Sequence, residues 1–333
     1  MDMVGSFPLT RLRRLRSEAW CRDLVAESEV RLKDLVQPVF VQEHIRPDFS
    51  YGGFYSVCPD DLARFMDKVI LAHGISKLAL FPVIDARDKD ETGSFAFKED
   101  NFFVRSLTFL KQYYPDVCLI TDVALDPFTS HGHDGLLENG DVANDVTAHR
   151  LAELSCLYAT SGVDIVAPSD MMDGRVEIIR RALDQSGYES VKILSYTAKY
   201  ASNFYGPFRV IMGAAEKPGL SKVTYQMDVR NSREALREAA IDINEGADFL
   251  MVKPALLSLD ILTLLKHWTS VPLFAYHVSG EYAMLCAASE KGFVDYEKGL
   301  WETLSVLKRA GAAGIVTYGA VDAARMMQVA AAG

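Results

Sequence analysis

The stretch Phe249-Leu-Met-Val-Lys-Pro-Ala255 joins a short apolar run to a lysine and a proline. The run has the length and composition of a strand buried on both faces, and Pro254 ends it directly after Lys253. Burial disfavours the charged form of a lysine and lowers its pKa toward values at which the neutral amine attacks a carbonyl. The alternative is a lysine that reaches out to water or pairs with a carboxylate. The stretch therefore predicts a buried strand that ends either in a nucleophile or in an ordinary cation.

Seven more apolar, β-prone runs occur along the chain, and amphipathic segments separate them. The predicted strands are 35–41, 77–83, 117–125, 164–168, 191–196, 249–252, 271–278 and 314–318. The predicted helices are 59–73, 101–114, 146–160, 175–185, 233–245, 259–268, the longer region 281–310 and 321–331. This alternation predicts an α/β fold, a (β/α)8 TIM barrel over residues 34–333. A doubly wound open sheet is the alternative, but no Gly-x-Gly-x-x-Gly follows the first strand.

Residues 1–33 precede the first strand and are basic and polar. Four arginines and three apolar residues interleave there: Arg11, Arg13, Arg14, Arg16, Leu12, Leu15 and Trp20. We interpret the segment as an extended N-terminal arm outside the barrel. It is either a solvated tail or an arm that packs on a neighbouring subunit of a homo-oligomer.

The overall composition argues against several classes of partner. The 333 residues carry 35 lysines and arginines against 45 acidic residues, a formal charge of -10, which argues against a nucleic-acid or anionic-membrane surface. No run approaches the length of a membrane span, and arginines stand where a secretory signal needs an apolar core. Five scattered cysteines without a Cys-x-x-Cys pair fit a reducing cytosol. We expect a cytoplasmic protein without nucleic-acid or membrane partners.

In a TIM barrel the chemistry lies at the carboxyl ends of the strands. Lysines, carboxylates and hydroxyls gather at these predicted positions: Asp85, Asp122, Ser169, Asp170, Lys199, Lys253, Ser279 and Tyr318. Each alone fits an ordinary polar cap on a strand. Their concentration at equivalent positions favours an active site at one mouth of the barrel.

Two lysines at one mouth indicate chemistry on carbonyl compounds. Lys199 and Lys253 would repel each other as ammonium ions, so each lowers the pKa of the other. A neutral lysine forms an imine with a ketone or an aldehyde. Three readings are open on these grounds: a Schiff-base aldolase that uses Lys253 alone, an enzyme that holds two carbonyl substrates, and a non-catalytic barrel that binds an anionic keto acid.

Two long loops add further candidates. The third loop, 121–135, carries two aspartates and two histidines: Asp126, His131, His133 and Asp134. These are metal ligands, proton-transfer groups, or residues of an ordinary turn. The fifth loop, 200–229, is rich in glycine, proline and aromatic residues and carries the cations Arg209, Lys217 and Lys222. We interpret it as a lid that binds an anionic substrate.

Six motifs follow one another in a recognisable order. They are the 121–135 loop, Ala167-Pro-Ser-Asp-Met-Met-Asp-Gly174, Ser195-Tyr-Thr-Ala-Lys-Tyr200, Phe204-Tyr-Gly-Pro-Phe-Arg209, Met251-Val-Lys-Pro254 and Ala275-Tyr-His-Val-Ser-Gly-Glu-Tyr282. In sequence and order they resemble the porphobilinogen synthase (5-aminolevulinate dehydratase) family, and the resemblance spans nearly the whole chain. It implies a lyase of tetrapyrrole (heme) biosynthesis that condenses two 5-aminolevulinate molecules to porphobilinogen with loss of two waters.

The resemblance also implies roles for individual residues. Lys253 would form a Schiff base with the substrate that gives the propionate side, and Lys199 with the one that gives the acetate side. Asp122 would orient the amino group of a bound substrate. The first carboxylate would be bound by Ser279 and Tyr318. The second would be bound from the lid by Arg209, Lys222 and Gln226, with Tyr205 of the same lid motif also at the substrate.

The third loop departs from the zinc-dependent members of the family, which have three cysteines where this chain has Ala124, Asp126 and Asp134. No cysteine-ligated zinc is expected there, and the two aspartates favour Mg2+ or no metal. Glu238 matches the ligand position of an allosteric Mg2+ in Asp-bearing relatives. The family also implies an octamer. A second departure is Gly319, after Tyr318, where relatives often have a bulkier residue.

Overall fold

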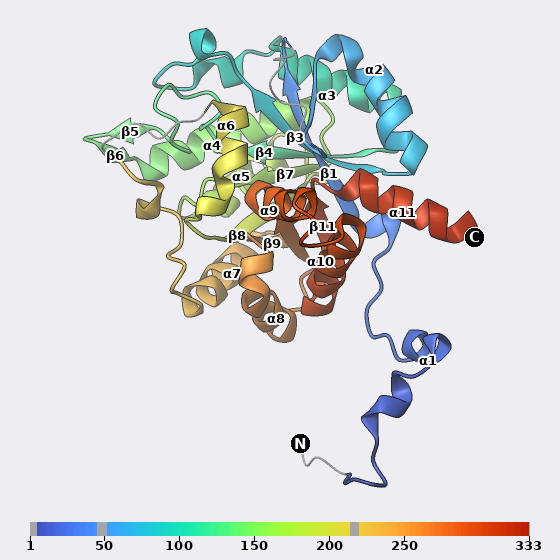
Figure 1. Cartoon of the computed structure of the whole chain (residues 1–333). Helices are drawn as coiled ribbons and strands as arrows, with labels where there is room; N and C mark the ends of the chain where they lie inside the picture. Colours follow the sequence, from blue (N-terminus) through green and yellow to red (C-terminus); the bar gives the residue numbers. More distant parts are fainter. Residues whose placement is uncertain (1–4, 45–51, 214–219, 333) are drawn as a thin grey trace.

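Eight parallel strands close into a barrel in the computed structural model, which describes residues 5–44, 52–213 and 220–332 (Figure 1). The strands of the barrel are β1 (Leu35–Gln42), β3 (Lys77–Val83), β4 (Cys118–Val123), β7 (Ile165–Pro168), β8 (Lys192–Lys199), β9 (Phe249–Lys253), β10 (Leu273–His277) and β11 (Ala312–Thr317). They pair in chain order, and β1 closes the ring on β11 through Leu35 with Ile315 and Val36 with Val316. The predicted TIM barrel is confirmed.

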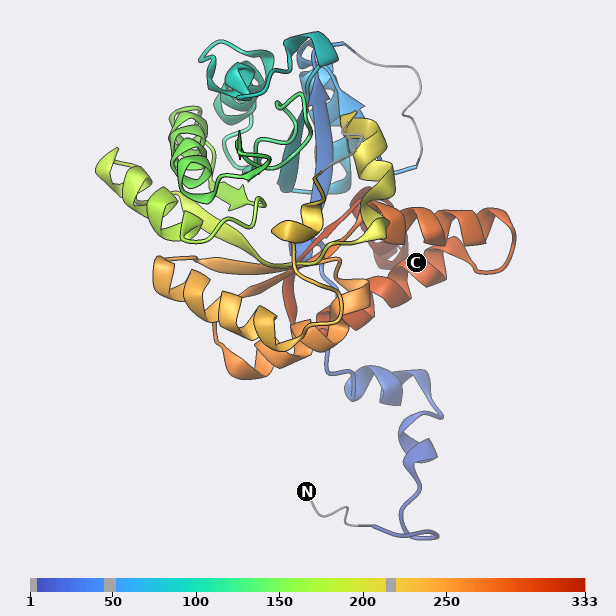
Figure 2. The same cartoon turned by 90° about the vertical axis from the view of Figure 1, so that its left-hand side faces the viewer.

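Helices cover the outside of the barrel (Figures 1 and 2). Those that follow the predicted segments closely are α3 (Phe102–Tyr113), α4 (Asn144–Thr160), α5 (Arg175–Gln185), α7 (Arg233–Glu245), α8 (Leu259–Trp268) and α11 (Ala320–Ala332). The segment 281–310 forms two helices, α9 (Ser279–Glu290) and α10 (Tyr296–Ala310), and the chain between them passes through Gly292 at a φ of 71°. The first predicted helix is irregular: α2 (Leu62–Phe65) continues into a π-turn, Met66–Ile70. No helix in the described part of the chain is long and apolar enough to cross a membrane.

Several smaller elements decorate the barrel and escape the sequence patterns. β2 (Tyr55–Val57) pairs with β1, and α6 (Gly206–Met212) lies in the fifth loop. β5 (Leu137–Glu138) and β6 (Asp141–Val142) form a hairpin whose turn residues, Asn139 and Gly140, have positive φ. Asn-Gly is the preferred sequence for such a turn, so this hairpin has a signal that strand periodicity alone does not register.

The alternation of side chains along β9 decides where Lys253 points. Leu250 and Val252 belong to the hydrophobic layer between the strands and the helices, whereas Met251 belongs to the layer inside the barrel. Successive side chains of a strand point to opposite faces. Lys253 therefore shares the interior face with Met251, and it lies at the carboxyl end of the strand, where the barrel opens to its loops.

Residues 5–31 run away from the barrel (Figures 1 and 2). The segment contains a 3-10 turn, Leu12–Leu15, and the short helix α1 (Ala19–Leu24). Large apolar side chains are exposed along it, with 82% of Leu9, 68% of Trp20 and 77% of Leu24 accessible. A contiguous set of exposed apolar residues is typical of a surface that packs against another molecule.

Candidate active site

Lys199 and Lys253 lie side by side at the mouth of the barrel. They end the neighbouring strands β8 and β9 and are paired in register. The register of this pairing shifts just before Ala198, which marks a β-bulge. Leu194 and Tyr196 face the interior, whereas Ala198 faces the helices, so the shift turns Lys199 inward. The bulge therefore brings the second lysine into the same mouth as the first.

Aromatic rings surround Lys253. Its side-chain nitrogen, Nζ, lies 4.7 to 5.3 Å from the ring centres of Tyr276, Tyr205, Tyr196 and Phe208. None of the ion pairs found among the described residues includes Lys253. Burial, followed by the charge of Lys199, lowers the pKa of Lys253 to about 7. Near neutral pH a large part of this lysine is therefore the free amine that imine formation requires.

Lys199 has polar partners instead. Its Nζ donates to Oδ1 of Asp134 at 3.1 Å and to the backbone oxygen of Ser169. Lys199 is 5% exposed and Lys253 is 7% exposed, so burial does not distinguish them. What distinguishes them is that Lys199 donates a hydrogen bond to a carboxylate, whereas no ion pair of Lys253 is found among the described residues.

Asp134 also joins Lys199 to the lid. Its Oδ2 accepts hydrogen bonds from the hydroxyl of Tyr225 at 2.7 Å and from Nζ of Lys222 at 2.9 Å. Nζ of Lys222 lies a further 3.4 Å from Oδ2 of Asp126. Burial acts to raise the pKa of Asp134, but the charges of Lys199 and Lys222 hold it well below its usual range. Burial likewise acts to lower the pKa of Lys222, and the two carboxylates raise it above its ordinary value. The group is a buried network in which Asp134 joins Lys199, Lys222 and Tyr225.

Asp122 lies on β4 close enough to both lysines for their charges to act on it. Burial, followed by the charge of Asp126, raises the pKa of Asp122 to about 7, while Lys199 and Lys253 act in the opposite direction. Its Oδ1 is buried and has no hydrogen-bond partner in the described part of the chain. A carboxyl group with these properties can exchange a proton with a reacting group near neutral pH.

Ser279 and Tyr318 adjoin the rings that surround Lys253. Oγ of Ser279 accepts a hydrogen bond from the backbone nitrogen of Phe208 at 3.1 Å. The hydroxyls of Tyr318 and Tyr276 are 3.3 Å apart. Because Phe208 and Tyr276 both contact Lys253, the two predicted carboxylate ligands lie on the Lys253 side of the mouth.

Packing explains the glycine that follows Tyr318. A Cβ at Gly319 would lie 2.7 Å from Cδ1 of Leu300, which belongs to α10. Real Cβ atoms essentially never show contacts that short, so a bulkier residue at this position would require the Leu300 side chain to shift. Tyr318 itself is buried, with its ring centre 4.3 Å from that of Phe54.

The other lid residues differ in how they meet the mouth. Tyr205 donates a hydrogen bond to the backbone oxygen of Lys253 at 3.2 Å, and the guanidinium of Arg209 lies 6.0 Å from the ring centre of Tyr205. Gln226 is buried, and its Oε1 has no hydrogen-bond partner among the described residues. Lys217 lies outside the described residues. Of these loop residues, Lys222 is joined to Lys199 through Asp134, and Arg209 lies beside the ring of Tyr205.

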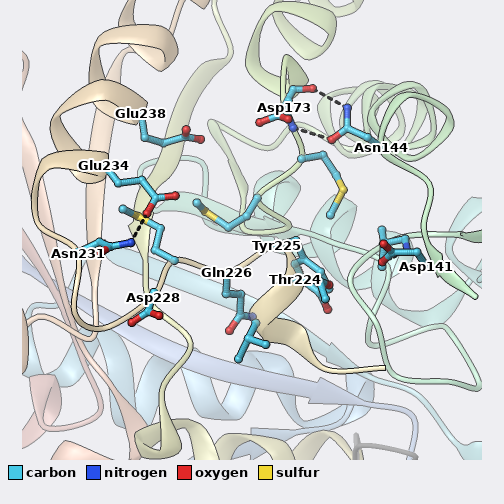
Figure 3. Close-up of a pocket in the computed structure, with 15 residues that line it drawn as sticks. Asp141, Asn144, Asp173, Thr224, Tyr225, Gln226, Asp228, Asn231, Glu234 and Glu238 are labelled. Carbon is cyan, nitrogen blue, oxygen red and sulfur yellow. Dashed lines mark hydrogen bonds between the residues drawn. The ribbon is translucent and has the colours of Figure 1, made fainter. Parts of the chain in front are cut away.

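Some candidates lie away from the two lysines. Asp170 faces Arg175, which is buried, with Nε 3.5 Å from Asp170 and NH1 3.3 Å from Glu238. Asp85 lies 3.8 Å from Arg87. Glu238 lines a cavity of about 450 Å3 on the surface (Figure 3). The other carboxylates that line it are Asp141, Asp173, Asp228 and Glu234.

The sequence patterns miss the rings around Lys253 and the role of Tyr225. The alternation along the strands could have identified Tyr196 and Tyr276 as interior residues near the carboxyl ends of their strands. Tyr196 is in β8, which ends at Lys199, and Tyr276 is in β10, which pairs with the Lys253 strand β9. Tyr225 links two loop residues, because its hydroxyl lies 3.1 Å from Nδ1 of His133 as well as 2.7 Å from Asp134. No sequence signal places residues about 90 positions apart in contact.

The arrangement of Asp126 and Asp134 does not fit a metal site. A hard divalent cation needs carboxylate oxygens that are available to coordinate it. Both oxygens of Asp134 accept from side chains, and Oδ2 of Asp126 lies next to Lys222. Within residues 5–44, 52–213 and 220–332, no group of three or more histidines, cysteines, aspartates and glutamates is placed to hold a metal ion.

Comparisons with known proteins show the family of this chain. The family model described as delta-aminolevulinic acid dehydratase matches residues 9–326. The delta-aminolevulinic acid dehydratase of Rhodobacter capsulatus is 43% identical over 327 residues, covering 96% of this chain and 97% of that protein. The corresponding protein of Streptomyces coelicolor is 43% identical over 333 residues, covering 98% and 100%.

A solved structure is also similar over nearly its full length. The crystal structure of delta-aminolevulinic acid dehydratase (porphobilinogen synthase) from Toxoplasma gondii, in complex with the reaction product porphobilinogen, has a TM-score of 0.92 and 43% identity to this chain. The match covers 95% of this chain and 91% of that one. The family match and these similarities over nearly the whole chain show that it belongs to the delta-aminolevulinic acid dehydratase (porphobilinogen synthase) family.

Proposed function

We propose that this protein is a porphobilinogen synthase, a lyase that condenses two molecules of 5-aminolevulinate to porphobilinogen with loss of two waters. The observation that carries the proposal is the in-register pair Lys199 and Lys253 inside one barrel mouth. Each substrate presents a ketone, to which an amine adds, and a carboxylate, which needs cations or hydroxyls. The site offers one lysine for each of the two ketones, and a separate set of cations or hydroxyls for each of the two carboxylates.

Lys253 forms the Schiff base with the substrate that gives the propionate side. With its pKa at about 7, free amine is present at neutral pH, and the surrounding rings keep water away from the imine. The amine nitrogen adds to the ketone carbon, and the ketone oxygen leaves as water. Ser279 and Tyr318, which adjoin the same rings, bind the carboxylate of this substrate.

Lys199 forms the Schiff base with the substrate that gives the acetate side. The carboxylate of this second substrate is bound by Arg209, Lys222 and Gln226. Tyr205, which lies between Arg209 and the backbone of Lys253, forms part of the wall that both substrates share. Two lysines with different partners give the two substrates different surroundings, as an asymmetric condensation requires.

Asp122 orients the amino group of a bound substrate and exchanges protons during the condensation. Its pKa of about 7 makes both the acid and the carboxylate available near neutral pH. Its unpartnered Oδ1 is the atom available to a substrate ammonium.

An allosteric Mg2+ ion is proposed at Glu238, outside the barrel mouth. Mg2+ usually keeps several of its waters and binds through one or two carboxylates, so it does not require a three-carboxylate cluster. Glu238 shares its surface cavity (Figure 3) with other carboxylates and with the lid residues Tyr225 and Gln226. An ion held there would therefore lie near Tyr225 and Gln226, which belong to the same loop as the proposed substrate ligands.

The arm, residues 1–33, is proposed to pack on a neighbouring subunit, and the catalytic barrel to comprise residues 34–333. The exposed apolar side chains of Leu9, Trp20 and Leu24 support this. The assembly implied by the family is an octamer, and the expected location is the cytoplasm.

The function is tested by incubating the protein with 5-aminolevulinate and measuring the pyrrole product colorimetrically. We expect sustained pyrrole formation that Mg2+ increases and that chelation of zinc leaves intact. No pyrrole with or without Mg2+ would reject the proposal. Borohydride reduction followed by peptide mass spectrometry then locates the imine, and adducts on neither Lys199 nor Lys253 would reject the mechanism.

A further inference from the structure

Asp134 engages two groups that the second substrate needs. Its Oδ1 accepts from Nζ of Lys199 at 3.1 Å, and its Oδ2 accepts from Nζ of Lys222 at 2.9 Å. In the proposed function, on which this inference rests, Lys199 is the nucleophile for the second substrate and Lys222 binds its carboxylate. The Asp134 side chain is 1% exposed, so water does not weaken these contacts.

A third donor fixes the carboxylate of Asp134 to the lid. The hydroxyl of Tyr225, three residues after Lys222, donates to the same Oδ2 at 2.7 Å. Asp134 comes from the loop after β4, and Tyr225 and Lys222 come from the loop after β8. The carboxylate of Asp134 therefore connects the loop after β4 to the loop after β8, and it does so next to Nζ of Lys199.

Asp126 has a different place in the same network. It reaches Lys222 at 3.4 Å, and no ion pair or hydrogen bond joins it to Lys199 among the described residues. Of the two aspartates, Asp134 alone contacts both the nucleophile and the carboxylate ligand. The two residues are thus a natural pair of test and control.

We propose that Asp134 is a positioning residue that stands in for the carboxylate of the second substrate. In the free enzyme one oxygen of Asp134 engages Nζ of Lys199 and the other engages Nζ of Lys222, so neither nitrogen is available to a substrate. The carboxylate of the incoming substrate takes over Lys222, Asp134 withdraws, and Lys199 is released to react. The second subsite therefore becomes available only to a keto compound that carries a carboxylate. We call Asp134 a latch in this sense: it holds Lys199 and Lys222 until a substrate carboxylate replaces it at Lys222.

The chemical step at Lys199 shows why the latch matters. The ammonium first gives up a proton, and its nitrogen adds to the ketone carbon. A carbon–nitrogen double bond forms, the ketone oxygen leaves as water, and the net change is ammonium plus ketone to iminium plus water. An ion pair with Asp134 stabilises the starting ammonium and so opposes the first event.

The test uses levulinate (4-oxopentanoate), which carries the ketone and the carboxylate of the substrate without its amine. The full chain is incubated with levulinate at neutral pH and reduced with borohydride, and the adducts on Lys199 and Lys253 are quantified by peptide mass spectrometry. Asp134→Asn keeps the shape of the side chain and its ability to accept hydrogen bonds, but removes its charge. We expect the ratio of Lys199 adduct to Lys253 adduct to rise about tenfold, as loss of one buried charge-assisted hydrogen bond predicts.

An unchanged ratio in Asp134→Asn overturns the proposal. A lowered ratio overturns it as well, because Asp134 would then be needed to activate Lys199. Asp126→Asn is the control, and its Lys199 adduct is expected to stay within about twofold of that in the unmodified protein, since the change removes no contact of Lys199. A rise in Asp126→Asn as large as in Asp134→Asn also counts against the latch.

A second variant covers the case in which Asp134→Asn does not fold. Tyr225→Phe removes one donor from Asp134 and keeps the carboxylate, so the ratio is expected to rise about threefold, consistent with loss of one hydrogen bond. A ratio equal to that of the unmodified protein overturns the latch.

Failure of the proposed function gives a different result. The unmodified protein would then show no adduct on either lysine and no pyrrole from 5-aminolevulinate, and the latch would fall with the function. If the unmodified protein forms pyrrole while the variants leave the ratio unchanged, the latch alone is rejected.

Discussion

Lys199 and Lys253 are the same residue at matched positions of neighbouring strands, and they are almost equally buried, yet their surroundings are opposite. Rings line the pocket of Lys253, and its pKa falls to about 7. Lys199 instead contacts the carboxylate of Asp134 and a backbone oxygen. The strands fix where each lysine lies, and the groups around each lysine differ: aromatic rings from strands and a loop surround Lys253, and a loop carboxylate contacts Lys199.

The difference also separates two ways of making a buried lysine tolerable. An unpaired buried cation is relieved by losing its proton, which produces a nucleophile. A paired one keeps its proton and becomes part of the structure until the pair is opened. At this mouth Lys253 is of the first kind, and Lys199 has the carboxylate partner that defines the second kind.

The largest expected effect is on turnover. Lys253→Met and Lys199→Met should each lower pyrrole formation by at least about 10³-fold, because each removes an imine nucleophile. A colorimetric pyrrole assay with 5-aminolevulinate measures this, and Lys298→Met, at an exposed lysine of α10, is the matched control. If Lys199→Met retained most of the turnover, the alternative of an enzyme that uses Lys253 alone would be correct.

Asp122→Asn should lower kcat by about 10²- to 10⁴-fold, the usual range for removal of a general acid or base. The amide keeps the size of the side chain but cannot exchange a proton at its pKa of about 7. Steady-state kinetics across pH 5 to 9 measure the effect. A variant with the kcat and pH profile of the unmodified protein would show that neither lysine depends on this carboxyl group.

Replacement of each lysine by methionine should change the free energy of unfolding in opposite directions at Lys253 and Lys199. The folded pKa of Lys253 is lowered from 10.5 to about 7, so between these values the unfolded chain binds a proton that the folded chain does not. The stability of the unmodified protein therefore rises with pH over this window, and the penalty is complete below about pH 7. Lys253→Met should stabilise the protein by roughly 5 kcal/mol at pH 6, and the gain should vanish near pH 10.5.

Lys199→Met should instead destabilise the protein by about 3 kcal/mol, because it removes one partner of a buried ion pair and leaves Asp134 short of a donor. Urea unfolding of both variants at pH 6, 8 and 10 compares them directly. If both variants were stabilised, or both destabilised, Lys253 would not differ from Lys199 in being an unpaired buried cation.

The smallest expected effect is that of Tyr205→Phe. The change removes the hydroxyl that donates to the backbone oxygens of Tyr200 at 2.7 Å and Lys253 at 3.2 Å, and it keeps the ring beside Nζ of Lys253. The free energy of unfolding should fall by about 1 kcal/mol, while the pH dependence of turnover stays the same. A shifted pH dependence would assign the hydroxyl, rather than the ring, to the environment of Lys253.

Local signals were enough to predict the barrel and the place of both lysines. Each strand is an apolar run with clear limits, and Pro254 marks the end of β9 directly after Lys253. The helical segments were predicted with similar success, although 281–310 is divided and 59–73 contains a π-turn. Such interruptions depend on how neighbouring helices pack, which periodicity along one segment does not record.

The partners of the lysines could not be predicted in the same way. The contact of Asp134 with Lys199 joins residues 65 positions apart, and that with Lys222 joins residues 88 apart. The strand predicted to end at residue 196 continues to Lys199 through a register shift that no composition rule marks. Loop closure and strand register are set by the whole fold, so a motif can name these residues without giving their contacts.

The β-bulge before Ala198 has a consequence for how a site of this kind can originate. A one-residue change of register exchanges the two faces of a strand, so a single inserted residue is enough to move a lysine from the helix-facing side of β8 into the barrel. Such an insertion supplies only the second lysine. In the proposed function the carboxylate of the second substrate is bound by Arg209, Lys222 and Gln226, which belong to the loop after β8, so a second subsite needs both the bulge and this loop.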